Sequence, residues 1–192
     1  MSLHDEMFEQ PAVLAGLVRS SPEATTAAAA ILSRPDVVHA VIAARGTSDN
    51  AARYAKYVWG SLAGLSVTLA APSLYGGYGT PPDLTGSAVV GISQSGQSPD
   101  LIAVVEEGRS QGRPTIAITN DPASPLAAMT DAVVPLVAGP EHAVAATKTY
   151  TATLFAIAAI AAAMQPDLDR SEDLAALPDA VAKTLAAETA IR

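Results

Sequence analysis

The sequence predicts an α/β fold, a doubly wound five-stranded parallel sheet flanked by helices. Two observations lead to this prediction. Short and uniformly apolar segments, typical of strands buried on both faces, alternate with helical segments over about 100 residues. Polar turns directly follow the first and third of these segments, where ligands bind in sheets of this class.

In the first half of the chain, amphipathic spacing predicts a helix over 3–18 that Pro11 interrupts as a second start. An alanine-rich helix over 22–32 follows. The run VVHAVIAA predicts the first strand. The further elements expected in this half are a polar turn at 46–50, a helix at 51–62, a strand at 66–71 and a Pro/Gly/Tyr loop at 72–83.

The second half continues the alternation and ends in two helices. The third strand is SAVVGI and the fourth is PTIAIT, and both are short apolar runs. The remaining elements expected here are a helix at 99–111, a helical turn around Leu126, a strand at 132–136, a loop up to 146 and helices at 147–164 and 171–189.

The composition excludes several classes of function. The net charge is −8, and only 11 Lys plus Arg are available for the basic face that a nucleic-acid binder needs. The absence of cysteine excludes disulfides, thiolate catalysis and cysteine-based zinc sites. Three histidines without an HxH or HExxH pattern predict no metal site, and we expect no cofactor.

We also expect a cytoplasmic protein without a membrane segment. The stretch MSLHDEMFEQP has neither the basic nor the apolar region of a signal peptide. The longest apolar run, Thr151–Met164, has 14 residues, whereas roughly 18–20 are needed to span a bilayer.

Three polar segments, Gly46–Asn50, Ser93–Ser98 and Gly139–Lys148, are predicted to converge on one pocket at the carboxyl ends of the strands. A strand-to-helix turn offers unpaired backbone N–H groups and the positive end of a helix dipole, which favour phosphate. In SQSGQS the serines add hydroxyl donors and Gly96 allows close approach of the backbone. The alternative is that these serines only cap helices.

No nucleotide-binding fingerprint accompanies these turns. The sequence has no GxGxxG after a strand and no GxxxxGK[ST]. We therefore expect the phosphate to belong to a small molecule other than ATP or NAD.

The segments ARGTSDNAARYAKY, GISQSGQSPD and EHAVAATKTYT resemble, in order and spacing, the sugar isomerase (SIS) domain family. They are most similar to tandem-SIS enzymes, namely the isomerase half of glutamine–fructose-6-phosphate aminotransferases and the amino-sugar-phosphate deaminases. EMFEQP is similar to the segment that opens the isomerase half in that group. The resemblance implies a flavodoxin-like α/β fold and a sugar phosphate as the small-molecule partner.

The resemblance also implies a substrate-binding set. Ser48 corresponds to the serine of the first sugar-contacting loop, and Ala146 stands where the aminotransferases have a serine. Arg45 and Asp49 depart from the synthase pattern, and a local ion pair is as good an interpretation for them as substrate contact. The full set is Gly46, Thr47, Ser48, Ser93, Gln94, Ser95, Ser98, Ala145, Ala146 and Lys148.

The catalytic residues stay open in the sequence. Glu141 and His142 form a candidate acid/base pair, with a loop pair at a subunit contact as the alternative. Lys148 lies at a helix start, where a cation opposes the dipole, so it is a candidate that lines the ligand loop or supports a neighbouring acidic group. The alternative for Lys148 is a surface lysine.

We divide the chain into N-terminal helices (1–35), a SIS domain (36–165) and a connecting helix (166–192). The resemblance implies that a second SIS domain, in tandem or supplied by a homodimer, brings the glutamate base and the ring-opening histidine. Self-association is also expected because the 147–164 helix has little polar surface and the last helix carries the stripe Leu174, Leu177, Val181 and Leu185.

The resemblance favours an aldose–ketose isomerase, deaminase or aminotransferase that acts on glucosamine-6-phosphate or fructose-6-phosphate. The alternative is a sugar-phosphate sensing module without catalysis. No helix-turn-helix or basic region accompanies the chain to support a regulator.

Overall fold

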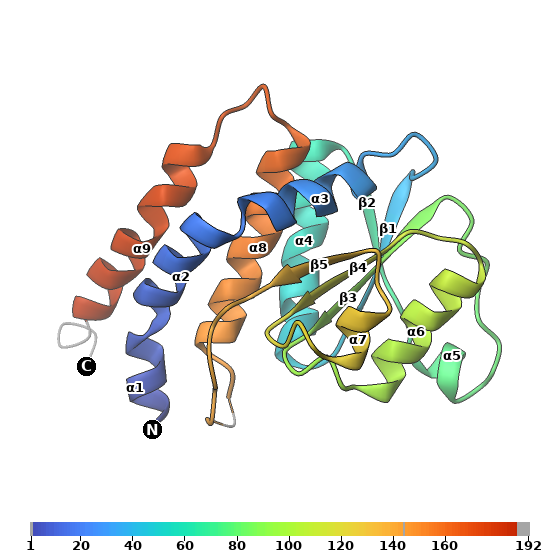
Figure 1. Cartoon of the computed structure of the whole chain (residues 1–192), viewed down its shortest axis with the longest axis horizontal. Helices are drawn as coiled ribbons and strands as arrows, with labels where there is room; N and C mark the ends of the chain where they lie inside the picture. The colour runs from blue at the N-terminus through green and yellow to red at the C-terminus, as the bar shows by residue number, and fades with distance from the viewer. Residues whose placement is uncertain (1, 144, 188–192) are drawn as a thin grey trace.

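The computed structural model describes residues 2–143 and 145–187 and has a five-stranded parallel sheet at its centre (Figure 1). The strands are β1 (His39–Ala44), β2 (Ser66–Leu69), β3 (Ser87–Ser93), β4 (Thr115–Thr119) and β5 (Ala132–Pro135). Their order is β2-β1-β3-β4-β5, and every neighbouring pair is parallel. The predicted fold class is confirmed.

Helices cover both faces of the sheet. The described helices are α1 (Leu3–Phe8), α2 (Gln10–Ser20), α3 (Pro22–Leu32), α4 (Thr47–Ala63), α5 (Ser73–Gly76), α6 (Pro99–Ser110), α7 (Pro125–Ala128), α8 (Lys148–Met164) and α9 (Ser171–Ala186). Figure 1 shows α3, α4 and α8 on one face of the sheet and α6 and α7 on the other. α5 lies beside α6.

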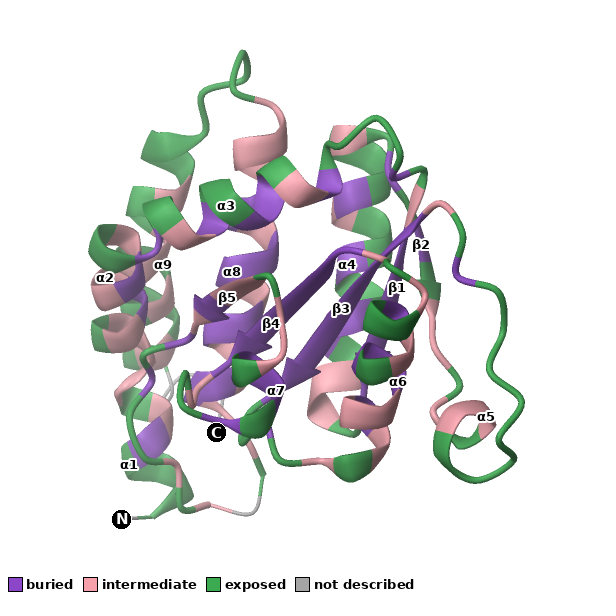
Figure 2. Cartoon of the chain, turned by 45° about the vertical axis from the view of Figure 1, so that its right-hand side comes forward, coloured by how far each residue is buried: buried purple, intermediate pink, exposed green. Residues whose placement is uncertain are grey.

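Alternating side chains of the strands form two separate cores. In β1, Ile42 packs with the helices of the α8 side, whereas Val41 packs with the α6 side. β3 repeats this alternation with Val90 and Val89. β3 and β4 are buried at every residue, and Figure 2 shows this as continuous purple strands. Burial on both faces explains why these strands are uniformly apolar in the sequence.

The α8 helix is covered by other parts of the same chain. It packs against α2, α3 and α4, and the indole N–H of Trp59 donates to its Ile157 carbonyl at 3.0 Å. Leu174, Leu177 and Val181 of α9 pack against the same core, where α9 lies along α2. The two apolar surfaces behind the expected self-association are therefore covered largely within the chain. A homodimer stays a prediction.

The element boundaries differ from the predictions mostly by one or two residues, with larger differences around α4 and α5. The turn predicted at 46–50 is wrong, because α4 already begins at Thr47. The predicted 72–83 loop contains the short helix α5, and β2 ends at Leu69, before the predicted 71. The interruption predicted at Pro11 is confirmed, since the segment forms two helices with Pro11 in the first turn of the second. The last predicted residues of the 171–189 helix, 188 and 189, lie outside the described residues.

Within the described ranges, none of the helices combines the length and apolarity that a membrane crossing requires.

Candidate functional site

The candidate site lies where the direction of the strand order changes. From β1 the chain passes outward to β2 and then back to β3 on the other side of β1. The crossover helices after β1 and β3 therefore diverge to opposite faces and leave a crevice at the carboxyl ends of these strands. A cavity of about 260 Å³ opens at this point.

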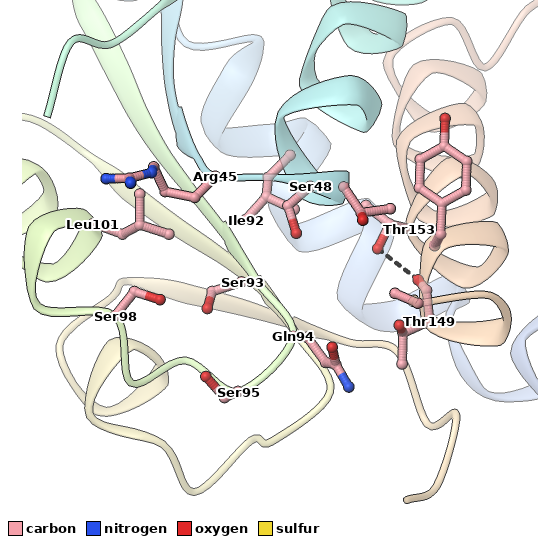
Figure 3. A pocket seen from close by; sticks show the side chains of 13 residues that line it. Arg45, Ser48, Ile92, Ser93, Gln94, Ser95, Ser98, Leu101, Thr149 and Thr153 are labelled. Carbon is pink, nitrogen blue, oxygen red and sulfur yellow. Dashed lines mark hydrogen bonds between the residues drawn. The ribbon is translucent and has the colours of Figure 1, made fainter. Parts of the chain in front are cut away.

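The lining of this cavity is almost entirely hydroxyl, amide and apolar groups (Figure 3). It comes from the end of β1 and the start of α4, from the turn after β3, and from one face of α8. The lining residues are Arg45, Thr47, Ser48, Ile92, Ser93, Gln94, Ser95, Ser98, Leu101, Ala146, Thr149, Tyr150 and Thr153.

The turn after β3 is held by its own side chains. The buried Ser93 hydroxyl accepts the backbone N–H of Gly96 at 3.1 Å, and the exposed Ser95 hydroxyl accepts that of Gln97 at 3.3 Å. Gly96 has φ +61°, a conformation that L residues rarely adopt. A Cβ atom there would lie 2.1 Å from Ser124 Oγ, so only glycine fits.

These serines do not cap the following helix through their side chains. Ser98 is the residue before the first turn of α6, and its hydroxyl makes no capping bond to that helix. Figure 3 shows the Ser93 and Ser95 hydroxyls on the side of the turn that borders the cavity. Among the described contacts neither hydroxyl donates, so both can donate to a ligand, which the helix-capping alternative does not explain.

Gly46 shapes the other turn. It connects β1 to α4 with φ +56° and ψ −127°, a combination in which a side chain would be strained. The sharp turn brings Thr47 and Ser48, in the first helical turn, to the cavity wall. Gly46 itself does not line the cavity; it sets the direction of the backbone there.

The α8 face of the cavity was missed by the sequence analysis. Thr149, Tyr150 and Thr153 line the cavity together with Ala146. Their spacing of three and four residues places them on one side of the helix. Hydroxyls at helical spacing in an otherwise apolar helix are the sequence signal that identifies such a face.

Glu141 has a structural role at the start of α8. Its Oε1 accepts the backbone N–H groups of Thr147 at 2.8 Å and Lys148 at 2.9 Å, and its other oxygen accepts the Thr149 hydroxyl. The carboxylate thus takes up N–H groups that a helix start leaves unpaired, and its charge suits the positive end of the helix. Neither Glu141 nor His142 lines the cavity.

Lys148 is buried, so its interpretation as a surface lysine is wrong. Its side chain is 2% exposed and pairs with the Glu9 carboxylate at the end of α1. The opposing helix dipole is offset by this partner and by Glu141 nearby. Lys148 and Ala145 do not line the cavity, although the predictions placed both in the substrate-binding set.

The N-terminal helix fastens the loop that leads into α8. Glu6 is fully buried, and its carboxylate accepts the backbone N–H groups of His142 at 2.5 Å and Ala143 at 3.0 Å. Gln10 accepts the Thr151 hydroxyl. Because this loop continues to Ala146 at the cavity wall, α1 positions part of the cavity. EMFEQP is therefore a loop anchor, with Glu6, Glu9 and Gln10 as its contacts.

Protonation of Glu6 is expected to weaken this anchor. The His142 N–H bond holds the pKa of Glu6 below its ordinary value of 4.5, and the N–H of Ala143 and the charge of Lys148 act in the same direction. A lowered folded-state pKa contributes stability that is complete above about pH 4.5 and lost as the pH falls below it. In Glu6→Gln this part of the acid sensitivity should disappear, and the variant should melt lower than wild type at pH 7.

The measurement is the melting temperature of both proteins between pH 7 and pH 3.5, with the gap between them expected to narrow as the pH falls. Glu106→Gln, at an exposed position of α6, is the matched control and should follow wild type throughout. A constant gap between Glu6→Gln and wild type at every pH would contradict the assigned role of the charge.

The cavity contains few ionisable groups. Among its described lining residues, Arg45 is the single charged side chain, and no Asp, Glu or His is present. No cluster of metal-ligating side chains occurs in 2–143 and 145–187. What the lining offers is a set of hydroxyl and amide donors beside two helix N-termini, which suits an oxygen-rich anion.

A protein-family model described as the SIS domain matches residues 32–163. Two curated relatives are glutamine–fructose-6-phosphate aminotransferases. That of Streptococcus pneumoniae is 35% identical over 166 residues and that of Zymomonas mobilis is 34% identical over 164 residues. Each alignment covers 83% of this chain and 27% of the relative. The chain thus spans about a quarter of the length of these relatives.

Solved structures agree in fold. A candidate phosphosugar isomerase from Silicibacter pomeroyi superposes with a TM-score of 0.87 at 32% identity, over 94% of this chain and 55% of that one. The C-terminal domain of glucosamine-fructose-6-phosphate aminotransferase from Francisella tularensis gives a TM-score of 0.75 at 26% identity, over 94% of this chain and 52% of that one.

Proposed function

Because this chain belongs to the SIS domain family, we propose that its cavity binds a sugar phosphate, with the phosphate in the Ser93–Ser98 turn. The observation that supports this most is the placement of the turn at the start of α6, with hydroxyls that cap no helix and a glycine that opens the backbone. The same proposal divides the chain into N-terminal helices (1–35), a SIS domain (36–165) and a connecting helix (166–192). The connecting helix would lead to a second SIS domain.

We further propose that the chain is the sugar-phosphate-binding half of an isomerase, deaminase or aminotransferase of the glucosamine-6-phosphate and fructose-6-phosphate type. Such chemistry opens the sugar ring and moves a proton between C1 and C2 through an enediol-type intermediate, by general acid–base catalysis. The phosphate turn supplies binding energy that positions the reacting carbons. Ser48 and Gln94 offer donors for the sugar hydroxyls, and the Thr149 and Thr153 hydroxyls, whose own protons are taken within the chain, can accept from them.

We propose that the residue that acts as general acid and base comes from outside this cavity. Its described lining contains no carboxylate and no imidazole, and Glu141 is occupied by the start of α8. A second SIS domain or a second copy of the chain supplies the missing group. Catalysis by this protein therefore depends on that partner. We also propose that the protein is located in the cytoplasm.

The same lack of an acid–base group favours a second function, a sugar-phosphate sensor that binds without turnover. Two measurements separate the candidates. Calorimetric titration with fructose-6-phosphate and glucosamine-6-phosphate, against fructose and glucosamine, tests phosphate-dependent binding. A turnover assay with glucosamine-6-phosphate, and with fructose-6-phosphate plus ammonia, tests catalysis.

Binding with turnover supports the enzyme, and binding without turnover supports the sensor. Equal affinity for the phosphorylated and unphosphorylated sugars would contradict both.

A further inference from the structure

Arg45 lines the cavity but belongs neither to the Ser93–Ser98 turn nor to the α8 face, so its role there needs a separate explanation. It follows β1 directly, and its side chain is 67% exposed. Figure 3 shows it next to Leu101, on the same side of the cavity as Ser98 and across from Ser48 and Thr149. Its guanidinium is thus placed on the same side as the proposed phosphate turn.

Asp100 holds Arg45 in this place. The Nη1 group of Arg45 pairs with Asp100 Oδ2, and Asp100 lies in the first turn of α6, next to the turn itself. A guanidinium has five N–H donors in a planar fork, and this pair engages one of its nitrogens. The described contacts assign no partner to its other nitrogens, so the fork can serve Asp100 and a second anion at the same time.

The surrounding negative charge disfavours an anionic ligand, so a cation in the cavity should strengthen the binding of one. The protein carries a net charge of −8, and both helices that begin at the cavity have an acid in their first turn, Asp49 in α4 and Asp100 in α6. Asp49 pairs with Arg53 at 3.1 Å. Each acid thus has its own arginine, but only Arg45 of the two arginines lines the cavity.

We propose that Arg45 contacts the phosphate of the ligand directly and makes the cavity selective for the dianionic form of a sugar phosphate. The proposal rests on the proposed sugar-phosphate function and adds the residue that selects the charge of the ligand. Asp100 acts as a positioning residue that directs the guanidinium toward the Ser93–Ser98 turn. Selectivity for the dianion follows because the remaining donors of the lining are neutral and distinguish the two phosphate charge states less.

The test compares Arg45→Gln with wild type by calorimetric titration of fructose-6-phosphate, glucosamine-6-phosphate and inorganic phosphate. Loss of one charge-assisted contact, reduced by solvent screening at an exposed side chain, should weaken binding of the sugar phosphates by about tenfold. Arg45→Lys keeps the charge without the planar fork and should recover part of the affinity. Arg53→Gln leaves Asp49 without its partner but removes no residue from the cavity, so it should weaken binding much less than Arg45→Gln does.

The pH dependence provides a readout that a purely structural role would not change. The second ionisation of a phosphate monoester lies near pH 6, so wild-type affinity should rise from pH 5 to pH 7.5 as the dianion forms. In Arg45→Gln this rise should be flatter. An equally steep rise in the variant would overturn the proposed selection of the dianion.

A double variant distinguishes direct contact between Arg45 and the phosphate from neutralisation of the Asp100 charge by Arg45. In Arg45→Gln alone, Asp100 loses its partner and repels an anion, which by itself lowers affinity. Arg45→Gln with Asp100→Asn removes that repulsion. Persistent weak binding in the double variant supports direct contact, whereas wild-type affinity would show that Arg45 only masks Asp100 and would overturn the proposal.

The titrations distinguish failure of the proposed function from failure of the role given to Arg45. If wild type binds none of these phosphates, the proposed sugar-phosphate function is wrong. If wild type binds fructose-6-phosphate and Arg45→Gln binds it equally well, the function stands and the role of Arg45 is wrong. Melting curves of all variants without ligand identify any loss of binding that comes from unfolding.

Discussion

Ser95→Ala should weaken the binding of fructose-6-phosphate and glucosamine-6-phosphate while the protein stays folded. The Ser95 hydroxyl is exposed, lines the cavity and accepts only a 3.3 Å bond from Gln97 within the described chain. Loss of one hydrogen bond to a charged group costs about 1.5–3 kcal/mol, which is roughly 10- to 150-fold in affinity. Stability should change by less than about 0.5 kcal/mol, the range of surface substitutions.

The experiment pairs calorimetric affinity with the thermal midpoint measured without ligand. Inorganic phosphate is titrated as well, because it tests the turn without a sugar. Ser61→Ala, at an exposed position of α4 away from the cavity, is the matched control and should change neither quantity. If Ser95→Ala instead melts several degrees lower and binds both sugar phosphates as wild type does, the turn is only a structural turn.

Gly96→Ala should be strongly destabilising and should also disrupt the phosphate turn. The new Cβ would lie 2.1 Å from Ser124 Oγ and 3.2 Å from Thr119 Oγ1. Ser124 cannot move easily, because it is 2% exposed and caps α7 through a 3.3 Å bond from Ala127. Left-handed strain of about 1–2 kcal/mol and overpacking of about 1–3 kcal/mol together predict a loss of about 3 kcal/mol.

For a chain of this size, a loss of about 3 kcal/mol lowers the melting temperature by roughly 6–12 °C. Gly112→Ala separates the two contributions, since Gly112 also has a positive φ, +67°, but a Cβ atom at Gly112 would meet no other atom within 4 Å. This variant should show the strain without the clash and lose about 1–2 kcal/mol. If Gly96→Ala and Gly112→Ala had equal melting temperatures, the close contact with Ser124 would not be the cause of the destabilisation.

Most of the fold followed from local pattern. The apolar runs of β1, β3 and β4 are buried on both sides of the sheet. Their uniformly apolar composition was therefore enough to predict them as central strands. Helix boundaries set by proline were predicted well, as at Pro22 and Pro99, because proline lacks the N–H that only the first turn can spare. The start of α4 was predicted four residues late, because GTSDN has the composition of a turn and yet Thr47 is helical.

The candidate site was predicted where its residues follow a strand. Ser48, Ser93 and Ser95 line the cavity because a parallel sheet brings the ends of β1 and β3 together. Lys148 does not line the cavity, and its pairing with Glu9 could not be predicted because Glu9 lies 139 positions away along the chain. Thr149 and Thr153 were missed because their hydroxyls, although at helical spacing, lie in an otherwise apolar helix, and only the fold places this side of α8 beside the cavity.

The sequence by itself thus determined the sheet, its helices and the turns that carry hydroxyls, since periodicity and turn chemistry are local properties of the chain. Only the tertiary structure decided which long-range partners the charged groups take: Glu6 with the 142–143 backbone, Lys148 with Glu9, and Arg45 with Asp100. The physical reason is that an ion pair depends on the distance between its charges in space, and the fold sets that distance between segments far apart in the sequence.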